Sequence, residues 1–215
     1  MNILYAFQPL YNRFIRPRLP KTKYRICAGI AVQDKALLDL GPRHYPEYKA
    51  GLLEGIRETV DDGDTVVIVG GGRGVSTIHC ARAGADEVIA FEAAESMIET
   101  AEQTLSENYV PEGCSVEFKH ALVGEAVEVY GAYDDAEFVA PNELPECDVL
   151  VMDCEGAERS ILAGIEGVDA AVVIEGHPER GVDPDLVRDE LRRIGIQWDE
   201  REYEPGSQKP VFVGT

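Results

Sequence analysis

The stretch VVIVGGGRGVSTIHCARAGADEVIAFE, residues 66–92, decides the fold of this chain. Its two apolar runs, Val66–Val69 and Val88–Phe91, are short and rich in β-branched residues, as parallel strands buried on both faces are. Between them lies a helix-length segment, and three glycines precede it: Gly70, Gly72 and Gly74. Without a Cβ, these positions let the backbone turn tightly and let a ligand approach the helix N-terminus. The stretch therefore predicts a nucleotide-type binding unit of strand, turn, helix and strand.

The spacing of the glycines separates two classes of ligand. A dinucleotide fingerprint needs G-x-G-x-x-G/A, and its last position falls on Val75 or Thr77 here. The G-x-G-x-G that is present resembles the first motif of S-adenosylmethionine (SAM)-dependent methyltransferases, although Ile68 stands where those enzymes usually have an acidic residue. Glu92 ends the second strand, where a carboxylate can accept both hydroxyls of a ribose.

The composition limits the class of protein. The 215 residues suffice for one sizeable α/β core and are few for two. Forty acidic against twenty basic residues give a net charge of −20, which repels phosphate groups and disfavours nucleic acid as a partner. The excess of Asp and Glu over Lys resembles proteins of halophilic archaea, where salt screens such self-repulsion. The alternative is an ordinary acidic protein.

Cysteine usage and hydropathy indicate the compartment. The five cysteines are scattered and form no C-x-x-C pair, so we expect reduced thiols rather than disulfides or a zinc cluster. No run reaches the roughly eighteen apolar residues of a membrane span, and Met1–Pro20 lacks the features of a signal peptide. We therefore predict a cytoplasmic protein.

Residues 1–43 are predicted to form a basic, aromatic extension of a single domain, residues 44–215. Residues 1–33 contain six basic side chains and no acidic one, so the rest of the chain carries a charge of −26. Two interpretations are open. In one, residues 1–25 lie on the inner membrane surface as a short amphipathic segment. In the other, which we favour, the arm packs its aromatic side chains and arginines against the acidic domain. The apolar residues at helical spacing are Ile3, Phe7, Leu10 and Phe14.

Downstream, apolar runs alternate with helical patterns. Further strands are predicted at Ser115–Phe118, Asp148–Met152 and Ala170–Ile174, and helices at Tyr45–Val60, Ser96–Asn108, Ala157–Ile165 and Asp183–Ile194. This alternation predicts an α/β protein with a doubly wound, mostly parallel sheet. At the end, Gln197–Tyr203 and Lys209–Gly214 flank the turn sequence EPGS and predict an antiparallel hairpin. A parallel sheet closed in this way resembles the Rossmann-like class I methyltransferase fold, which implies a seven-stranded sheet.

A second motif, DVLVMDCEGAERSILAG at residues 148–164, makes the resemblance more specific. It is similar to the FkbM family of methyltransferases, which has D-x-E-G-A-E after its fourth strand and E-x-H after its fifth. The matching positions are Asp153, Glu155, Gly156, Ala157 and Glu158 in the first pattern and Glu175 and His177 in the second. The resemblance covers approximately residues 45–177 and implies SAM as the cofactor. We interpret Glu158 as structural, because an acid at the start of a helix interacts favourably with its macrodipole.

Three of the predicted strands end in a carboxylate: Glu92, Asp153 and Glu175. In a doubly wound sheet, ligands bind outside the carboxyl ends of the strands. Carboxylates gathered there would repel one another unless a cation or several donors lay among them, and the ammonium group and ribose hydroxyls of SAM supply both. We assign Glu92 to the ribose and Asp153 to the sulfonium and methionine end. The turn around the methionyl part is assigned to Gly70, Gly72 and Gly74.

The combined pattern predicts a SAM-dependent methyltransferase acting on an oxygen of a small molecule or glycan, either a hydroxyl or a carboxylate. A hydroxyl must lose its proton, which requires a general base. His177 is the first candidate because its ordinary pKa lies near neutrality, and the alternatives are Asp153, Glu155 and Glu175. A carboxylate acceptor needs no base.

Other classes stay open at this point. An NAD(P)-dependent oxidoreductase and a non-catalytic binding module of the same fold are the alternatives to a methyltransferase. No close cluster of His and Asp predicts a metal site, although three acids at one sheet edge leave Mg²⁺ open. The sequence does not decide the oligomeric state.

Overall fold

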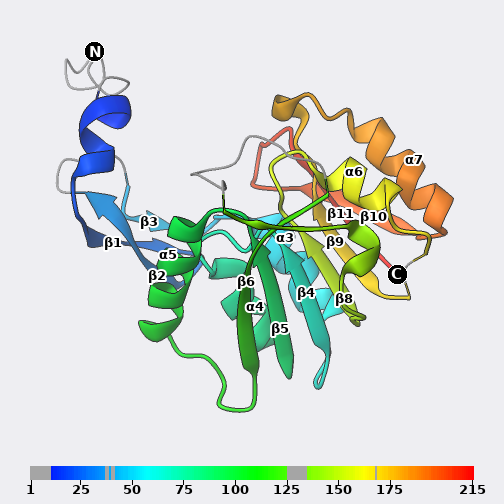
Figure 1. Ribbon diagram of the computed structural model, residues 1–215, viewed down its shortest axis with the longest axis horizontal. Helices are drawn as coiled ribbons and strands as arrows, with labels where there is room; N and C mark the ends of the chain where they lie inside the picture. The colour runs from blue at the N-terminus through cyan, green and yellow to red at the C-terminus, as the bar shows by residue number, and fades with distance from the viewer. Residues whose placement is uncertain (1–10, 37–38, 40–41, 125–134, 168) are drawn as a thin grey trace.

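The computed structural model describes residues 11–36, 39, 42–124, 135–167 and 169–215, and its centre is one large sheet (Figure 1). Eight strands follow the order β10-β11-β9-β8-β4-β5-β6-β7. Every neighbouring pair is parallel except the two that β11 makes with β9 and β10. The bounds are β4 (Thr65–Val69), β5 (Glu87–Glu92), β6 (Ser115–Val123), β7 (Glu137–Val139), β8 (Val149–Met152), β9 (Ala171–Glu175), β10 (Trp198–Glu202) and β11 (Pro210–Gly214). The predicted doubly wound sheet with its C-terminal hairpin is confirmed.

The strand count differs from the predicted seven. The eighth strand, β7, pairs with the end of β6 and forms one edge of the sheet. It has only three residues, and all of them are exposed or half-buried. A strand this short has no hydrophobic periodicity, which is why the sequence does not reveal it.

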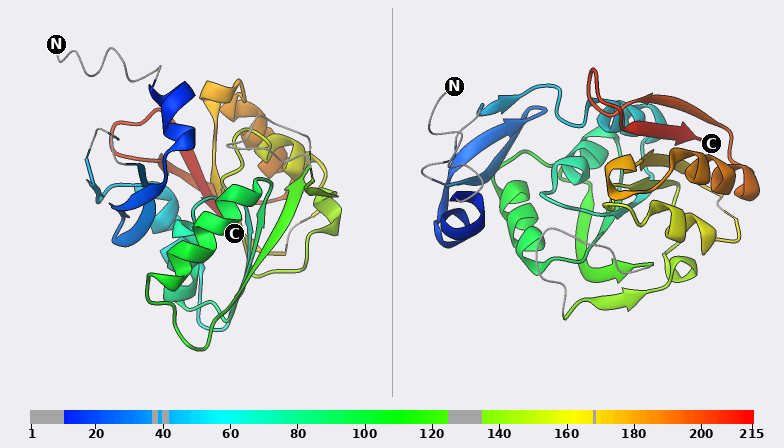
Figure 2. Two further views of the ribbon diagram at one scale, coloured as in Figure 1. Left: turned by 60° about the vertical axis from the view of Figure 1, so that its left-hand side comes forward. Right: turned by 90° about the horizontal axis from the view of Figure 1, so that it is seen from above.

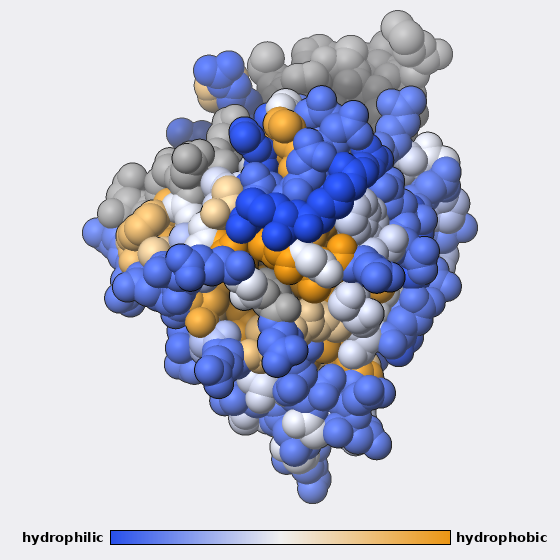
Figure 3. All heavy atoms as spheres, turned by 90° about the vertical axis from the view of Figure 1, so that its right-hand side faces the viewer, coloured by the Kyte–Doolittle hydropathy of each residue, from blue (hydrophilic) through white to orange (hydrophobic). Residues whose placement is uncertain are grey.

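Helices cover both faces of the sheet, as Figure 2 shows in the view from above. Along β4 the side chains alternate: Val66 and Ile68 pack with α3 and α4, whereas Val67 and Val69 pack in a second cluster with α6 and α7. This alternation gives the molecule two hydrophobic layers, one on each side of the sheet. The helices are α3 (Ala50–Thr59), α4 (Val75–Ala83), α5 (Glu95–Ser106), α6 (Glu158–Ala163) and α7 (Pro184–Ile194). On the α7 side the surface is mostly hydrophilic, with apolar side chains recessed between charged ones (Figure 3).

The N-terminal region contains a small sheet that the sequence analysis did not predict. Its order is β2-β1-β3, with β1 (Lys21–Cys27), β2 (Ile30–Ala36) and β3 (His44–Tyr45). Cys27, Ile30 and Val32 belong to the same hydrophobic cluster as α3 and α4. The small sheet therefore shares a core with the large one, and its third strand begins just after the predicted domain boundary.

The basic arm is partly tied to this small sheet. A π-helical turn (Tyr11–Ile15) leads into a 3-10 turn (Arg16–Arg18). Arg16 bonds to Asp39, and so does the hydroxyl of Tyr11, whereas Phe14 and Ile15 are exposed. Residues 1–10, which hold most of the predicted amphipathic pattern, lie outside the described residues. No helix in the described part of the chain has the length and apolar character that crossing a bilayer requires.

Candidate active site

A cavity of about 310 Å³ lies at the carboxyl ends of the central strands, as the topology predicts. Six of the eight predicted site residues line it: Gly70, Gly72, Glu92, Asp153, Glu155 and Glu175. Gly74 and His177 are not among the lining residues. The rest of the wall includes side chains that the sequence analysis did not select, namely Tyr48, Lys49, Arg73, Tyr203 and Lys209.

The glycine turn is shaped by close backbone packing. Gly70 has a φ of +88°, and a Cβ there would lie 1.9 Å from the carbonyl oxygen of Asp153. Gly72 also has a positive φ, but a Cβ would meet no atom closer than 3.9 Å. Gly74 precedes α4 and faces Ala101 and Leu105 of α5, so its smallness serves helix packing. The first glycine thus brings β4 against the segment after β8, and the second borders the cavity.

Glu92 ties the end of β5 to the glycine turn. Its Oε2 accepts a hydrogen bond of 2.8 Å from the amide of Gly72, and its Oε1 accepts one of 2.9 Å from Ala94. Burial raises the pKa of Glu92, although these two amide donors partly offset the effect. Ile68, by contrast, is fully buried in the core on the α3 side and does not line the cavity.

Lys49 is the functional candidate that the sequence analysis missed. It precedes α3 in a left-handed conformation with a φ of +53°, and its ammonium forms an ion pair with Asp153. Each of these features costs free energy. A left-handed non-glycine residue is strained, and a cation at a helix N-terminus opposes the macrodipole. The side chain of Lys49 is only 13% exposed, so its charge is largely removed from water. The signal in the sequence that could have identified Lys49 is the rarity of lysine, since the chain has six lysines against forty acidic residues.

Glu175 is the second carboxylate of the cluster. It ends β9 next to the end of β8, which brings it into contact with Asp153. Its Oε1 accepts a hydrogen bond of 2.8 Å from the ammonium of Lys209 and lies 3.3 Å from Nε2 of His177. Its Oε2 is buried, and no donor among the described residues bonds to it. One oxygen of Glu175 is thus committed to cations, and the other is available.

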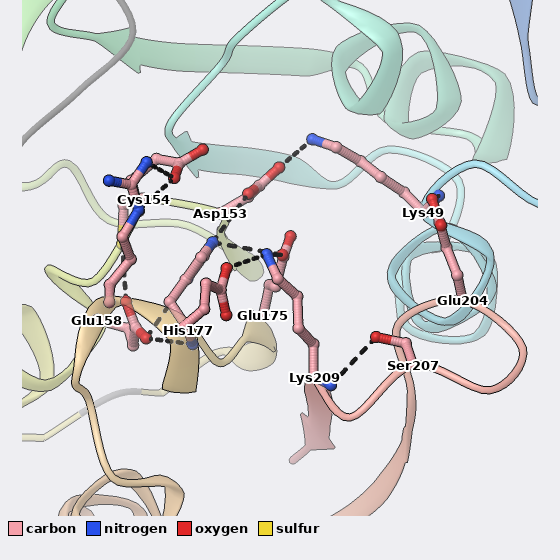
Figure 4. A network of polar contacts seen from close by, with 12 residues as sticks. Lys49, Asp153, Cys154, Glu158, Glu175, His177, Glu204, Ser207 and Lys209 are labelled. Carbon is pink, nitrogen blue, oxygen red and sulfur yellow. Dashed lines mark hydrogen bonds and ion pairs between the residues drawn. The ribbon is translucent and has the colours of Figure 1, made fainter. Parts of the chain in front are cut away.

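His177 joins the two sequence motifs into one unit (Figure 4). Its Nε2 lies 3.3 Å from Glu175 and 3.8 Å from Asp153, and its Nδ1 lies 3.4 Å from Oε1 of Glu158. The same oxygen of Glu158 accepts the backbone amide of His177 at 2.9 Å. His177 is 1% exposed and lies behind the carboxylates rather than on the cavity wall. Glu158 therefore does more than cap its helix, because it holds the imidazole in place.

The charges of this cluster shift its pKa values in opposite directions. Burial alone would raise the pKa of Asp153, but the adjacent Lys49 ammonium lowers it to about 2. Burial and the charge of Asp153 raise the pKa of Glu175 to about 8. Burial lowers the pKa of His177, yet its contacts with Glu158 and Glu175 outweigh that effect and raise it. Near neutral pH, Asp153 is ionised and Glu175 holds a proton.

Two lysines supply the positive charge of the cluster. Asp153, Glu175 and His177 each bring one polar atom within 4.8 Å of the others, so the structure has a close cluster of His and acidic residues that the sequence analysis did not expect. Both carboxyl groups already contact an ammonium group, Lys49 on Asp153 and Lys209 on Glu175. The structure thus assigns the charge balance of the cluster to these lysines.

Glu155 stands apart at the rim of the cavity. Like Lys49 it is a non-glycine residue with a φ of +53°, and Gly156 after it has a φ of +111°. Its carboxylate is bound to Arg180 at 2.9 Å, and both side chains are partly exposed. This pair links the loop after β8 to the short 3-10 turn Pro178–Arg180 after β9.

The raised pKa of Glu175 makes the stability of the protein depend on pH. In the unfolded chain this carboxyl ionises near its ordinary value of 4.5, whereas in the folded protein it keeps its proton up to about pH 8. Rising pH between these values therefore favours the unfolded state. We expect the melting temperature of the wild type to fall from pH 5 to pH 8 relative to that of a Glu175→Gln variant. An equal change in melting temperature with pH for the two proteins would refute this prediction.

Several solved structures resemble this chain. The ribosomal protein L11 methylase of Lactobacillus delbrueckii subsp. bulgaricus matches with a TM-score of 0.57 at 15% identity, over 79% of each chain. The tRNA (uracil-54, C5)-methyltransferase of Pyrococcus abyssi, in complex with S-adenosyl-L-homocysteine, matches with 0.58 at 14% identity, over 91% of this chain and 44% of that one. The magnesium protoporphyrin IX methyltransferase of Synechocystis, with bound S-adenosylhomocysteine, gives 0.53 at 14% identity, over 78% and 84%. The chain has the class I methyltransferase fold.

Sequence comparison finds a relative of this chain but no matching protein family. Uncharacterized protein 158B of Sulfolobus islandicus rod-shaped virus 1 is 31% identical over 97 residues, which are 45% of this chain. The chain spans about half of that protein, 50% of its length. No protein-family model matches the chain. The FkbM resemblance and the halophilic origin therefore stay predictions.

Proposed function

We propose that the protein is a SAM-dependent methyltransferase that transfers a methyl group to an oxygen of a small molecule or glycan. The observation that carries the proposal is the position of Glu92. On a methyltransferase fold, its carboxylate lies on the wall of the cavity and bonds to the glycine turn. A carboxylate at this point can accept ribose hydroxyls, as expected for an adenosine-containing cofactor.

The cavity offers such a cofactor space at the glycine turn and side chains that can donate and accept hydrogen bonds. Gly72 leaves open space where any other residue would place a Cβ, so a ligand can approach the turn closely. At the other end, Asp153 already binds a cation, the ammonium of Lys49. When bound, SAM supplies an electrophilic methyl group on a sulfonium. Gly70, Gly72 and Gly74 form the turn, Glu92 holds the ribose, and Asp153 faces the positively charged end.

The residues around Asp153 are suited to activating an oxygen nucleophile. A hydroxyl acceptor must pass its proton to a base as the new bond forms. Glu175 is the best placed of the predicted candidates, since it lines the cavity and has one oxygen without a donor among the described residues. His177 lies behind it and positions it, and Glu155 is bound to Arg180 at the rim. Orientation of the acceptor oxygen toward the methyl carbon supplies the rest of the rate.

Calorimetric titration tests the proposed cofactor. We expect the wild type to bind SAM and S-adenosylhomocysteine but not NAD. Glu92→Ala removes a charged acceptor for two hydroxyls and should weaken SAM binding by about a hundredfold or more.

The matched control is Glu87→Ala, at the opposite and exposed end of the same strand, which should bind SAM as the wild type does. Binding of NAD in place of SAM would favour an oxidoreductase. A wild type that binds neither would point to a non-catalytic module.

The acceptor and the partners belong to the same proposal. A net charge of −20 disfavours nucleic acid, although two structures of similar fold act on a ribosomal protein and on tRNA. Lys49, Arg73 and Lys209 on the cavity wall suit an acceptor with negative or strongly polar groups. We retain a cytoplasmic location, with residues 1–25 as the part of the chain that would contact the inner membrane surface. Phe14 and Ile15, each about half exposed, and Tyr24, 39% exposed, are the exposed large apolar residues in the described part of that arm.

A further inference from the structure

The carboxyl groups of Asp153 and Glu175 are in contact at one end of the cavity, and their hydrogen-bond and ion-pair partners differ. Asp153 forms an ion pair with Lys49 on one side and faces the imidazole of His177 on the other. Glu175 receives one ammonium on Oε1 and has no donor for Oε2 among the described residues. A buried carboxylate oxygen without a donor is costly, but a protonated one beside Asp153 is itself a donor. A proton that Glu175 shares with the neighbouring Asp153 would therefore satisfy this carboxyl group.

We propose that Glu175 is the general base of the methyltransferase, and that the positive charge of the cofactor makes it one by expelling the shared proton. The inference rests on the proposed function, because it needs a sulfonium in the cavity. Glu175 cannot take a proton from the acceptor while it already holds one. A cation in addition to Lys49 and Lys209 beside the Asp153 and Glu175 carboxyl groups stabilises the doubly ionised pair and lowers the pKa of Glu175 from about 8.

The charged and titratable groups around Glu175 come from every element that surrounds it. Lys49 at the start of α3 and Lys209 before β11 are cations, and Lys209 also contacts Glu179. Asp153 follows β8, and His177 and Glu158 lie behind it. Glu92, Cys154 and Tyr203 are further titratable groups that interact with this pair. Tyr48 acts on Lys49. Of these groups, Glu175 is the carboxyl on the cavity wall that has a buried oxygen without a donor among the described residues.

The proton balance closes over one turnover. Glu175 releases its proton to solvent when the cofactor binds. As the acceptor oxygen bonds to the methyl carbon, the carbon–sulfur bond breaks and its electron pair stays on sulfur. The acceptor proton passes to Glu175, and the product cofactor is a neutral thioether. Without the extra cation, Glu175 keeps that proton until the next SAM binds. The base is therefore absent from the empty enzyme and from the product complex.

Proton release on binding tests the inference without an identified acceptor. SAM and S-adenosylhomocysteine are titrated by calorimetry at pH 7 in buffers of different ionisation enthalpy, with EDTA present. The dependence of the heat on buffer gives the protons released. Because a carboxyl with a pKa about one unit above the pH is mostly protonated, we expect SAM to release about 0.5 to 1 proton more than S-adenosylhomocysteine.

Glu175→Gln keeps the shape of the side chain but has no titrating group, so SAM and S-adenosylhomocysteine should release almost the same number of protons. The amino group of each ligand contributes equally in both variants and cancels. Glu87→Gln, an exposed carboxyl of β5, should behave as the wild type.

Two outcomes would overturn the inference, and a third would overturn the proposed function. Equal release by both ligands in the wild type would show that no group responds to the sulfonium charge. A difference that persists in Glu175→Gln would assign the proton to another group, such as His177. If Glu175→Gln does not fold, equal release by both ligands in the wild type still overturns the inference. SAM that fails to bind the wild type would overturn the proposed function itself.

Discussion

Gly70→Ala should destabilise the protein by about 3 to 5 kcal/mol, because its Cβ would overlap backbone atoms in a left-handed conformation. The added atom would lie 1.9 Å from the carbonyl oxygen of Asp153 and 2.7 Å from its carbon. Neither strand end can move away easily, since β4 and β8 are neighbours in the centre of the sheet. The free energy of unfolding from denaturant titration measures the effect.

Gly72→Ala is the matched control for this prediction. It has a similar positive φ, but the nearest atom to its Cβ would be 3.9 Å away. Only the backbone strain remains, so the loss should be about 1 to 2 kcal/mol. Equal losses for the two variants would mean that φ alone matters and that the contact with Asp153 does not. Gly72→Ala should still weaken SAM binding, because its methyl group would project toward the cavity.

Glu158→Ala should cost about 3 to 5 kcal/mol of stability, because it removes one partner from a buried charged network. Glu158 is fully buried, accepts the amide of His177 at 2.9 Å and lies 3.4 Å from its Nδ1. Without it, the amide of His177 loses its acceptor, the imidazole loses the carboxylate beside Nδ1, and His177 no longer holds Glu175 and Asp153 in place. Unfolding free energies, measured at pH 7, test the prediction.

Glu158→Gln separates the two roles of this side chain. Its amide oxygen can still accept the backbone amide of His177, so we expect a smaller loss than for alanine. The charge that stabilises an imidazolium is gone, however, so the pKa of His177 should fall toward its ordinary value. That pKa can be followed by NMR of the imidazole. If Glu158→Ala lost as little stability as Glu158→Gln, neither contact of Glu158 with His177 would contribute to stability.

The positions of the helices and strands follow from local patterns. The strands around residues 66–92 form where the apolar runs predict them, because each run is buried on both faces. The helix predicted from Tyr45 begins only at Ala50, since β3 uses His44 and Tyr45 and Lys49 turns the chain with a positive φ. The β1 and β2 hairpin went unpredicted because its two-residue turn, Ala28 and Gly29, carries an alanine where such turns usually have Asn or Gly.

The sequence by itself determined which carboxyl groups meet at this end of the sheet, because Glu92 and Glu175 end strands, Asp153 directly follows one, and parallel strands end at one edge. It also determined the glycine turn, which is a local requirement of the backbone. Only the tertiary structure decided which cationic side chains form ion pairs with those carboxylates. Lys49 reaches Asp153 across 104 residues of sequence, and Lys209 reaches Glu175 across 34. Such pairings depend on how α3 and the C-terminal hairpin cross the end of the sheet, which no local periodicity encodes. The tertiary structure also placed His177 behind the carboxylates, because Glu158 at the start of α6 accepts its backbone amide.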